Sequence, residues 1–168
     1  MSQDRNREER FQEVLRSAGR RLTAIVRSYA RGEERRDLHQ EILLQIWRSL
    51  GTFESRASLL TWAYRVALNT AITYRRKTST SPLLTGSPDG GPARGVAAEE
   101  GHGSTRDEIL LLEEFIEGLG KIDRAVFLLY LEDLSYKEVA EVTGLTESAI
   151  GARINRIKKT FTERYLRG

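Results

Sequence analysis

The chain has 168 residues, with 27 lysines and arginines against 24 aspartates and glutamates, and its formal net charge is +3. This length fits one large domain or two small ones, and the absence of cysteine excludes disulfide scaffolds and zinc or nucleophilic sites built on cysteine. No apolar run approaches the roughly 20 residues of a membrane span, and the polar N-terminus lacks the apolar core of a signal peptide. We therefore expect a cytoplasmic protein without membrane insertion.

The charge is unevenly distributed along the chain. Residues 1–77 carry 16 basic and 9 acidic side chains, whereas residues 107–141 carry 10 acidic and 3 basic ones. Residues 142–168 are again basic, with 6 basic and 2 acidic side chains. Two separate basic zones favour contact with a polyanion such as a nucleic acid. Solvated helix faces remain the alternative for either zone taken alone.

The N-terminal part predicts a polar arm followed by a helix. Residues 1–10 are almost entirely polar and predict a frayed arm. From Phe11 to Tyr29 the apolar residues recur at helical spacing, although Gly19 argues against a continuous helix. Gly32 is the expected C-terminal stop.

A second helix is predicted from about Glu33 to Leu50, with an apolar face that covers about half of its circumference. The opposite face places an exposed leucine among carboxylate, amide and guanidinium side chains. This composition suits docking of another protein, whereas a singly exposed leucine of no consequence is the alternative. The residues of this face are Asp37, Gln40, Glu41, Leu44 and Arg48.

A third helix is predicted to begin after an N-cap at Ser58 and to run to about Lys77. Its outward stripe combines a tryptophan with arginines, which is typical of a platform that stacks bases of a single strand beside its phosphates. Coverage of the tryptophan by the preceding loop or by the first helix is the alternative. The stripe contains Trp62, Arg65, Asn69, Thr73 and Arg76, and Arg56 lies in the preceding loop.

Residues 78–105 differ in composition from the rest of the chain. They contain all three prolines and six of the fourteen glycines, together with many hydroxyl side chains. This composition predicts a flexible linker between two modules, residues 1–77 and 106–168. Two modules joined in this way can bind separate sites on one long ligand.

Four helices are predicted in the second module, residues 106–168. Apolar residues from Ile109 to Leu119 mark the first, and the second runs from Asp123 to Glu132. Ser135 begins a capping box for a short third helix that ends at Gly144, and a longer fourth helix follows towards Tyr165. A short helix, a tight turn and a longer helix that ends in cations indicate a helix-turn-helix, with an ordinary helical hairpin as the alternative.

The fourth helix has a polar face that suits a DNA major groove. Its side chains are short near the N-terminal end, and cations follow that can reach phosphates. The whole chain is therefore expected to be all-α, with two small helical domains joined by a flexible linker and a helix-turn-helix in the C-terminal one. The polar face contains Ser148, Ala152, Asn155, Arg156 and Lys159, with Arg153 and Lys158 as further candidates for phosphates.

The order of these segments resembles that of bacterial RNA polymerase sigma factors of the small extracytoplasmic-function type. The family segment that binds the clamp helices of the polymerase β′ subunit is similar to DLHQEILLQIW. The segments that melt and recognise the minus-ten promoter element are similar to TFESRASLLTWAYRVALN and TAITYRRK. Region four, which contacts the minus-thirty-five element and the β flap, is similar to LEDLSYKEVAEVTGLTESAIGARINRIKKTF.

The resemblance implies a role for each candidate residue. Asp37, Gln40, Glu41 and Leu44, with Arg48 beside them, would face core RNA polymerase. Arg56, Trp62, Arg65, Asn69, Thr73 and Arg76 would face the melted minus-ten strand, and a loop corresponding to residues 53–59 would hold a flipped base. Glu147, Ser148, Ala152, Arg153, Asn155, Arg156 and Lys159 would contact minus-thirty-five duplex DNA. The family also implies regulation by an anti-sigma factor.

The chain departs from the family pattern at two positions. Arg36 stands where relatives commonly carry the first carboxylate of an acidic pair, which removes a negative charge from the polymerase-docking face. Gly151 stands where the family often carries a basic or larger residue, so base preference cannot be carried over from relatives.

Two other function classes are alternatives to a sigma factor. A stand-alone helix-turn-helix regulator would use only residues 106–168, usually as a dimer, but the sequence offers no obvious dimerisation helix. An enzyme is disfavoured because the chain has two histidines, no cysteine and no phosphate-binding glycine motif on a strand. No cofactor and no metal are expected.

Overall fold

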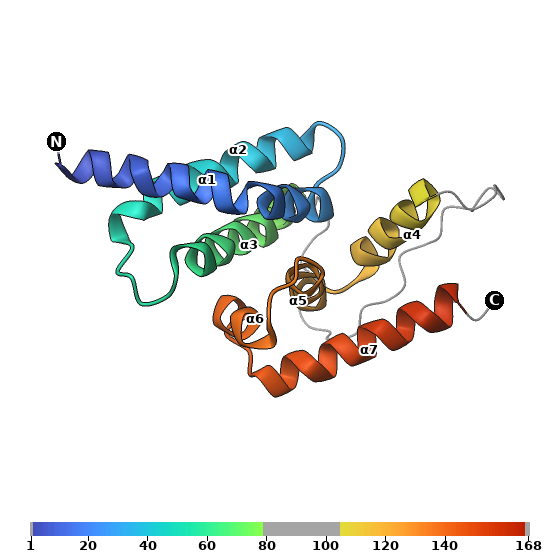
Figure 1. Cartoon of the computed structure of the whole chain (residues 1–168). Coiled ribbons are helices and arrows are strands. Elements are labelled where there is room, and N and C mark those ends of the chain that lie inside the picture. The colour runs from blue at the N-terminus through green and yellow to red at the C-terminus, as the bar shows by residue number, and fades with distance from the viewer. Residues whose placement is uncertain (1, 79–104, 167–168) are drawn as a thin grey trace.

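The computed structural model describes residues 2–78 and 105–166, with side chains for residues 4–74 and 107–166. Over these ranges the chain forms seven α-helices, one short 3-10 turn and no strand, which confirms the all-α fold class (Figure 1). The predicted linker lies almost wholly outside the described residues.

The first three helices form an N-terminal bundle. Helix α1 spans Ser2–Tyr29, α2 spans Glu34–Ser49, and α3 spans Leu59–Thr78, with a 3-10 turn at Leu50–Thr52. All three helices pack against one another. The core contains Leu22 of α1, Leu38 and Ile42 of α2 and Tyr64 of α3, each at most 2% exposed.

Helix α1 differs from the prediction at both points where the sequence argued against helix. It begins at Ser2 rather than near Phe11, and it continues through Gly19 without a break. The extension is held by Arg7, which donates from Nε (2.9 Å) and Nη2 (2.6 Å) to the backbone oxygen of Trp47. The Arg7 guanidinium also lies 4.5 Å from the centre of the Trp47 ring. Tertiary contact with the end of α2 thus overrides weak local propensity.

The remaining four helices form a C-terminal bundle: α4 (Thr105–Gly118), α5 (Lys121–Leu131), α6 (Tyr136–Thr143) and α7 (Glu147–Tyr165). Helix α5 lies in the centre, and its run from Arg124 to Leu129 is buried throughout. The predicted capping box of α6 is confirmed, since Ser135 and Glu138 satisfy each other's backbone donors. Thr146 caps α7 by accepting from the Ala149 amide at 3.2 Å, and Gly144 ends α6 with φ of 77°.

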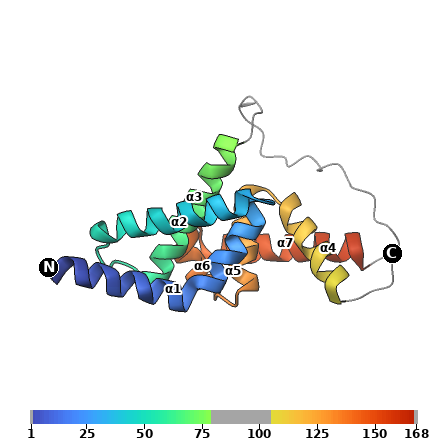
Figure 2. The ribbon, with the colours of Figure 1, turned by 90° about the horizontal axis from the view of Figure 1, so that it is seen from above.

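The two bundles pack directly against each other, with α4 and α5 contacting α1 and with α6 contacting α3 (Figures 1 and 2). Arg124 of α5 joins them and is only 3% exposed. Its guanidinium donates to the Ile116, Glu117 and Leu119 carbonyls at the end of α4, and to the Ser28 carbonyl of α1 at 3.0 Å. Tyr29 lies under this guanidinium at 5.1 Å and donates its hydroxyl to the Lys121 carbonyl at 3.0 Å.

We expect Arg124→Met to lower the free energy of unfolding by about 3 kcal/mol, because it leaves buried carbonyls at two helix ends without a charged donor. Urea unfolding followed by circular dichroism measures this change. Lys137→Met, an exposed lysine on α6, is the matched control and should stay within about 0.5 kcal/mol of the parent. Equal stability of the two variants would contradict the role assigned to Arg124.

Candidate nucleic-acid and protein-docking surfaces

The predicted docking face lies on the outside of α2. Asp37, Gln40, Leu44 and Arg48 are exposed, and Leu44 keeps 40% of its surface accessible. Glu41 is half-buried and accepts a 2.8 Å hydrogen bond from Gln45 Nε2. Arg36, also exposed, precedes Asp37 on the same helix. The face thus combines an accessible leucine with charges of both signs.

The carboxylates of α2 also act on the neighbouring helix. The pKa of the Tyr74 hydroxyl on α3 lies above its usual range, first because of burial and then because of the negative charges of Asp37, Glu34 and Glu41. Glu41 and Tyr74 line the same groove between α2 and α3, together with Gln45 and Thr73.

Trp62 is less free than the sequence predicted. Its ring is half-buried and lies 5.2 Å from that of Phe53, at an interplanar angle of 51°. Arg10 of α1 lies over the Phe53 ring, with its guanidinium 5.5 Å from the ring centre. The alternative, in which the preceding loop covers Trp62, is therefore confirmed in part. The reason is that the loop after α2 folds back over the start of α3, where Phe53 gains an apolar neighbour.

Arg65, in the middle of the predicted stripe, contacts the C-terminal bundle instead of facing solvent alone. Its guanidinium donates to the backbone oxygens of Glu141 and Val142 at the end of α6. Asn69 and Thr73 are exposed, and Arg56 is exposed in an ion pair with Glu54 at 2.7 Å. The side chain of Arg76 lies outside the described residues.

Sequence reasoning missed two apolar residues on this side of α3. Leu68 is 4% exposed, and Ile72 lines a groove with Ile122 of α5 and with residues at the end of α6. At about 3.6 residues per turn, Leu68 lies roughly 60° and Ile72 roughly 20° from Arg65 on the helix. This second apolar stripe, beside cations, is the signal that could have predicted an intramolecular contact.

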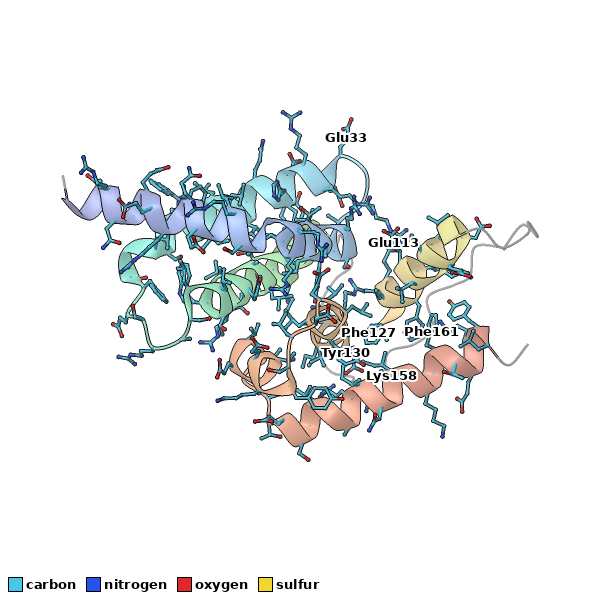
Figure 3. All side chains as sticks on the ribbon, viewed as in Figure 1. Glu33, Glu113, Phe127, Tyr130, Lys158 and Phe161 are labelled. Atoms are coloured by element: carbon cyan, nitrogen blue, oxygen red, sulfur yellow. The ribbon has the colours of Figure 1, made fainter. Side chains whose placement is uncertain are left out.

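The predicted groove-facing side of α7 is accessible. Glu147, Ser148, Ala152, Asn155, Arg156 and Lys159 are all exposed. Arg153 is only partly exposed, and both it and Arg156 form ion pairs with Asp123 of α5. Lys158 points towards α5 instead, where its amino group lies 4.4 Å from the Tyr130 ring centre and donates to the Tyr130 hydroxyl (Figure 3).

Gly151 lies beside the first residue of α6 within the helix-turn-helix unit. A Cβ atom at this position would lie 3.4 Å from Cε2 of the Tyr136 ring, which is van der Waals contact. Packing against Tyr136 therefore does not by itself require a glycine here.

Two family models match the chain, one over the N-terminal bundle and one over the C-terminal bundle. The model for Sigma-70 region 2 covers residues 14–80, and the model for Sigma-70, region 4, covers residues 109–161. The chain belongs to the sigma-70 family. It is a sigma factor that directs promoter recognition by RNA polymerase, and the family predicted from the sequence is confirmed.

Curated relatives and solved structures agree with this assignment. The RNA polymerase sigma-H factor of Pseudomonas aeruginosa is 27% identical over 88% of this chain and 81% of its own length. The ECF RNA polymerase sigma-E factor of Escherichia coli K12 is 26% identical over 84% of this chain and 78% of its own length. These are sigma factors of the type that the sequence resembles. The match to region 2 leaves the stand-alone regulator unfavoured.

Two solved structures share the fold. One is described as CnrH in complex with the cytosolic domain of CnrY, with a TM-score of 0.65 and 21% identity over 91% of this chain and 85% of that chain. The other is the sigma factor RpoE in complex with the anti-sigma factor NepR from Bartonella quintana, with a TM-score of 0.64 and 21% identity over 90% and 93%.

None of the described helices is long and apolar enough to cross a membrane. Between residues 4–74 and 107–166, no cluster of three or more histidine, aspartate or glutamate side chains is placed to hold a metal ion.

The helix-turn-helix makes one pH-dependent contribution to stability. The pKa of Glu138 lies below its usual range because the backbone amide and the hydroxyl of Ser135 donate to its carboxylate. A carboxyl with a lowered folded pKa stabilises the fold above its unfolded pKa, and this stabilisation is lost as the pH falls through the folded value.

We therefore expect Glu138→Gln to be less stable than the parent at pH 7 by about 0.5 kcal/mol, the usual size of a carboxylate effect at a helix N-terminus. The difference should shrink as the pH falls from about 4.3, the ordinary pKa of glutamate, through the lower folded-state pKa of Glu138. Denaturant unfolding at pH 7 and at a series of pH values below about 4 measures it. Glu141→Gln, an exposed carboxylate on the same helix without a capping role, should show no such convergence.

Proposed function

We propose that this sigma factor divides its work among three surfaces. The outer face of α2 docks on the clamp helices of the polymerase β′ subunit, α3 and its preceding loop hold the melted minus-ten strand, and α7 contacts minus-thirty-five DNA while its module touches the β flap. The observation that carries this proposal is the accessible α2 face, with Leu44 exposed among charged residues, on the same bundle as the Phe53–Trp62 pair.

The strand-handling surface would act by stacking and by charge. Phe53 and Trp62 already form an aromatic pair, and an unstacked base that extends this pair gains about 1–3 kcal/mol. Arg56 lies in the same loop with an exposed guanidinium that can exchange Glu54 for a phosphate. The surface would favour unpaired DNA over duplex because only unpaired bases offer a free ring face.

The helix-turn-helix would set the position on duplex DNA. Ser148, Ala152 and Asn155 are short enough to approach base edges, whereas Arg156 and Lys159 can reach phosphates. Arg153 is held by Asp123 and would act as a positioning residue on the flank of α7. Glu147, in the first turn, is placed to accept from a base amino group.

The partners follow from the same scheme. Core RNA polymerase supplies the chemistry, so the chain itself needs no catalytic group, cofactor or metal and acts in the cytoplasm. An anti-sigma factor is a further expected partner, because one similar structure is described as the sigma factor RpoE in complex with the anti-sigma factor NepR, and another as CnrH in complex with the cytosolic domain of CnrY.

Purified protein should co-elute with core RNA polymerase and give promoter-dependent run-off transcripts. Leu44→Asp should weaken core binding about tenfold or more, because it replaces the leucine of the docking face with a charged side chain. Fluorescence anisotropy of labelled protein measures the affinity, with Arg16→Asp on the exposed side of α1 as the control. Absence of core binding by the parent under any salt condition would refute the proposal.

Trp62→Ala should leave core affinity unchanged and reduce open-complex formation about tenfold, because a stacking surface of roughly 1–3 kcal/mol is lost. Permanganate reactivity of thymines in the promoter reports strand opening. Leu60→Ala, in the first turn of the same helix and also half-buried, controls for general damage to α3. Normal opening by Trp62→Ala would remove α3 from the strand-handling role.

A further inference from the structure

The first turns of α1 lie outside the family match and yet contact the strand-handling surface. The model for Sigma-70 region 2 begins at residue 14, whereas α1 begins at Ser2. Helix α1 also contacts the 3-10 turn at Leu50–Thr52, which leads into the loop before α3 (Figure 1). The family match therefore assigns no role to the first turns of α1.

Two contacts fix these turns against the end of α2. The Arg7 guanidinium donates to the Trp47 carbonyl and lies over the Trp47 ring. The Phe11 ring meets the same indole edge-on, with ring centroids 5.2 Å apart and an interplanar angle of 78°. Arg10 lies between these two anchors in the sequence. Its place above the loop is therefore set by the packing of its neighbours.

Arg10 differs from the other arginines near the strand-handling surface, because its guanidinium has no acceptor. Arg7 donates to a carbonyl, Arg56 pairs with a carboxylate, and Arg65 donates to the end of α6. Within the part of the chain whose side chains the structure describes, Arg10 makes no hydrogen bond and no ion pair, and it lies over the Phe53 ring. The side chain is nevertheless half-buried. A partly desolvated guanidinium with unused donors favours an anion as its partner.

The Arg10 guanidinium lies beside the aromatic pair that is proposed to stack an unpaired base. The Phe53 ring contacts both groups, with its centre 5.5 Å from the guanidinium and 5.2 Å from the centre of the Trp62 ring. One sugar separates a base from its phosphate, so a base that stacks on this pair brings a phosphate to the edge of the pair. Arginine suits both neighbours, because the face of a guanidinium packs on a ring while the N–H groups at its edge donate to phosphate.

We propose that Arg10 is a phosphate contact for the unpaired promoter strand, placed there by turns of α1 that precede the family match. This inference rests on the proposed strand-handling function of Phe53 and Trp62. The ligand is the phosphodiester next to the stacked base, and Arg7 is a positioning residue that fixes the turn carrying Arg10. General attraction of a basic segment does not explain the contact, since residues 4–10 carry three arginines and three carboxylates.

Promoter DNA with a permanently unpaired minus-ten segment tests this contact separately from strand opening. Holoenzyme with Arg10→Gln should bind this DNA about tenfold more weakly than parental holoenzyme, because a charged hydrogen bond is lost. The slope of log affinity against log salt should fall by about 0.7, as expected for one phosphate contact on a single strand. Arg10→Lys keeps the charge and should retain most of the slope. Arg16→Gln, which removes an exposed cation of the same helix, is the matched control and should change neither quantity.

Neutral methylphosphonate linkages, placed one at a time in the unpaired strand, identify the phosphate. One linkage should weaken binding by parental holoenzyme and have no further effect on holoenzyme with Arg10→Gln, because both changes remove the same contact. A role of Arg10 in folding alone predicts weaker binding with an unchanged salt slope and no such linkage. Either of these results would overturn the phosphate contact, and so would loss of core affinity by both Arg10→Gln and Arg10→Lys.

Trp62→Ala separates this inference from the proposed function in the same assay. Weaker binding of the unpaired promoter by Trp62→Ala, with no effect of Arg10→Gln, would refute the phosphate contact and leave the strand-handling role of α3 in place. Normal binding by Trp62→Ala would instead refute that role. The methylphosphonate series would then still decide whether Arg10 contacts the strand.

Discussion

The buried guanidinium of Arg124 is the interaction on which the arrangement of this sigma factor depends. It satisfies three carbonyls at the end of α4 and one at the end of α1, and it lies over the Tyr29 ring. A charged group buried to this degree is tolerated only when its donors find acceptors, and helix C-termini supply them. Because those acceptors come from both bundles, one side chain stabilises α4 and also sets where α1 lies.

The Arg65 guanidinium donates to the carbonyls at the end of α6, whereas the proposed function would have it meet a phosphate along α3. Both partners offer oxygen acceptors and negative potential, so the same guanidinium suits either. The uneven charge along the chain thus has a structural consequence in addition to its proposed role in DNA binding, since the acidic segment 107–141 supplies the internal partner.

The sequence predicted the local structure well where the signal was local. Ser135 and Glu138 form their capping box, Thr146 caps α7, and Gly144 ends α6 with positive φ, because each of these features depends on residues within one turn. Gly32 also has positive φ, but it lies in the turn beyond Tyr29, where α1 ends. The sequence-based prediction was wrong about the first ten residues, since the contact of Arg7 with the end of α2 comes from a residue 40 positions away. Gly19, which weakened the prediction of a continuous helix, lies within α1. Trp62 was predicted to face outward, and only the folded loop could bring Phe53 against it.

Helical periodicity, charge segregation and motif order by themselves determined the all-α class, the order of the two family regions and the candidate residues on α2, α3 and α7. These properties depend on residue types and on short spacings within single helices. Tertiary structure alone decided that α6 lies against Arg65, that Leu68 is buried, and that Arg124 reaches Ser28. The physical reason is that each contact joins groups more than 70 positions apart or depends on such a contact, and helical periodicity says which face is apolar but not what will cover it.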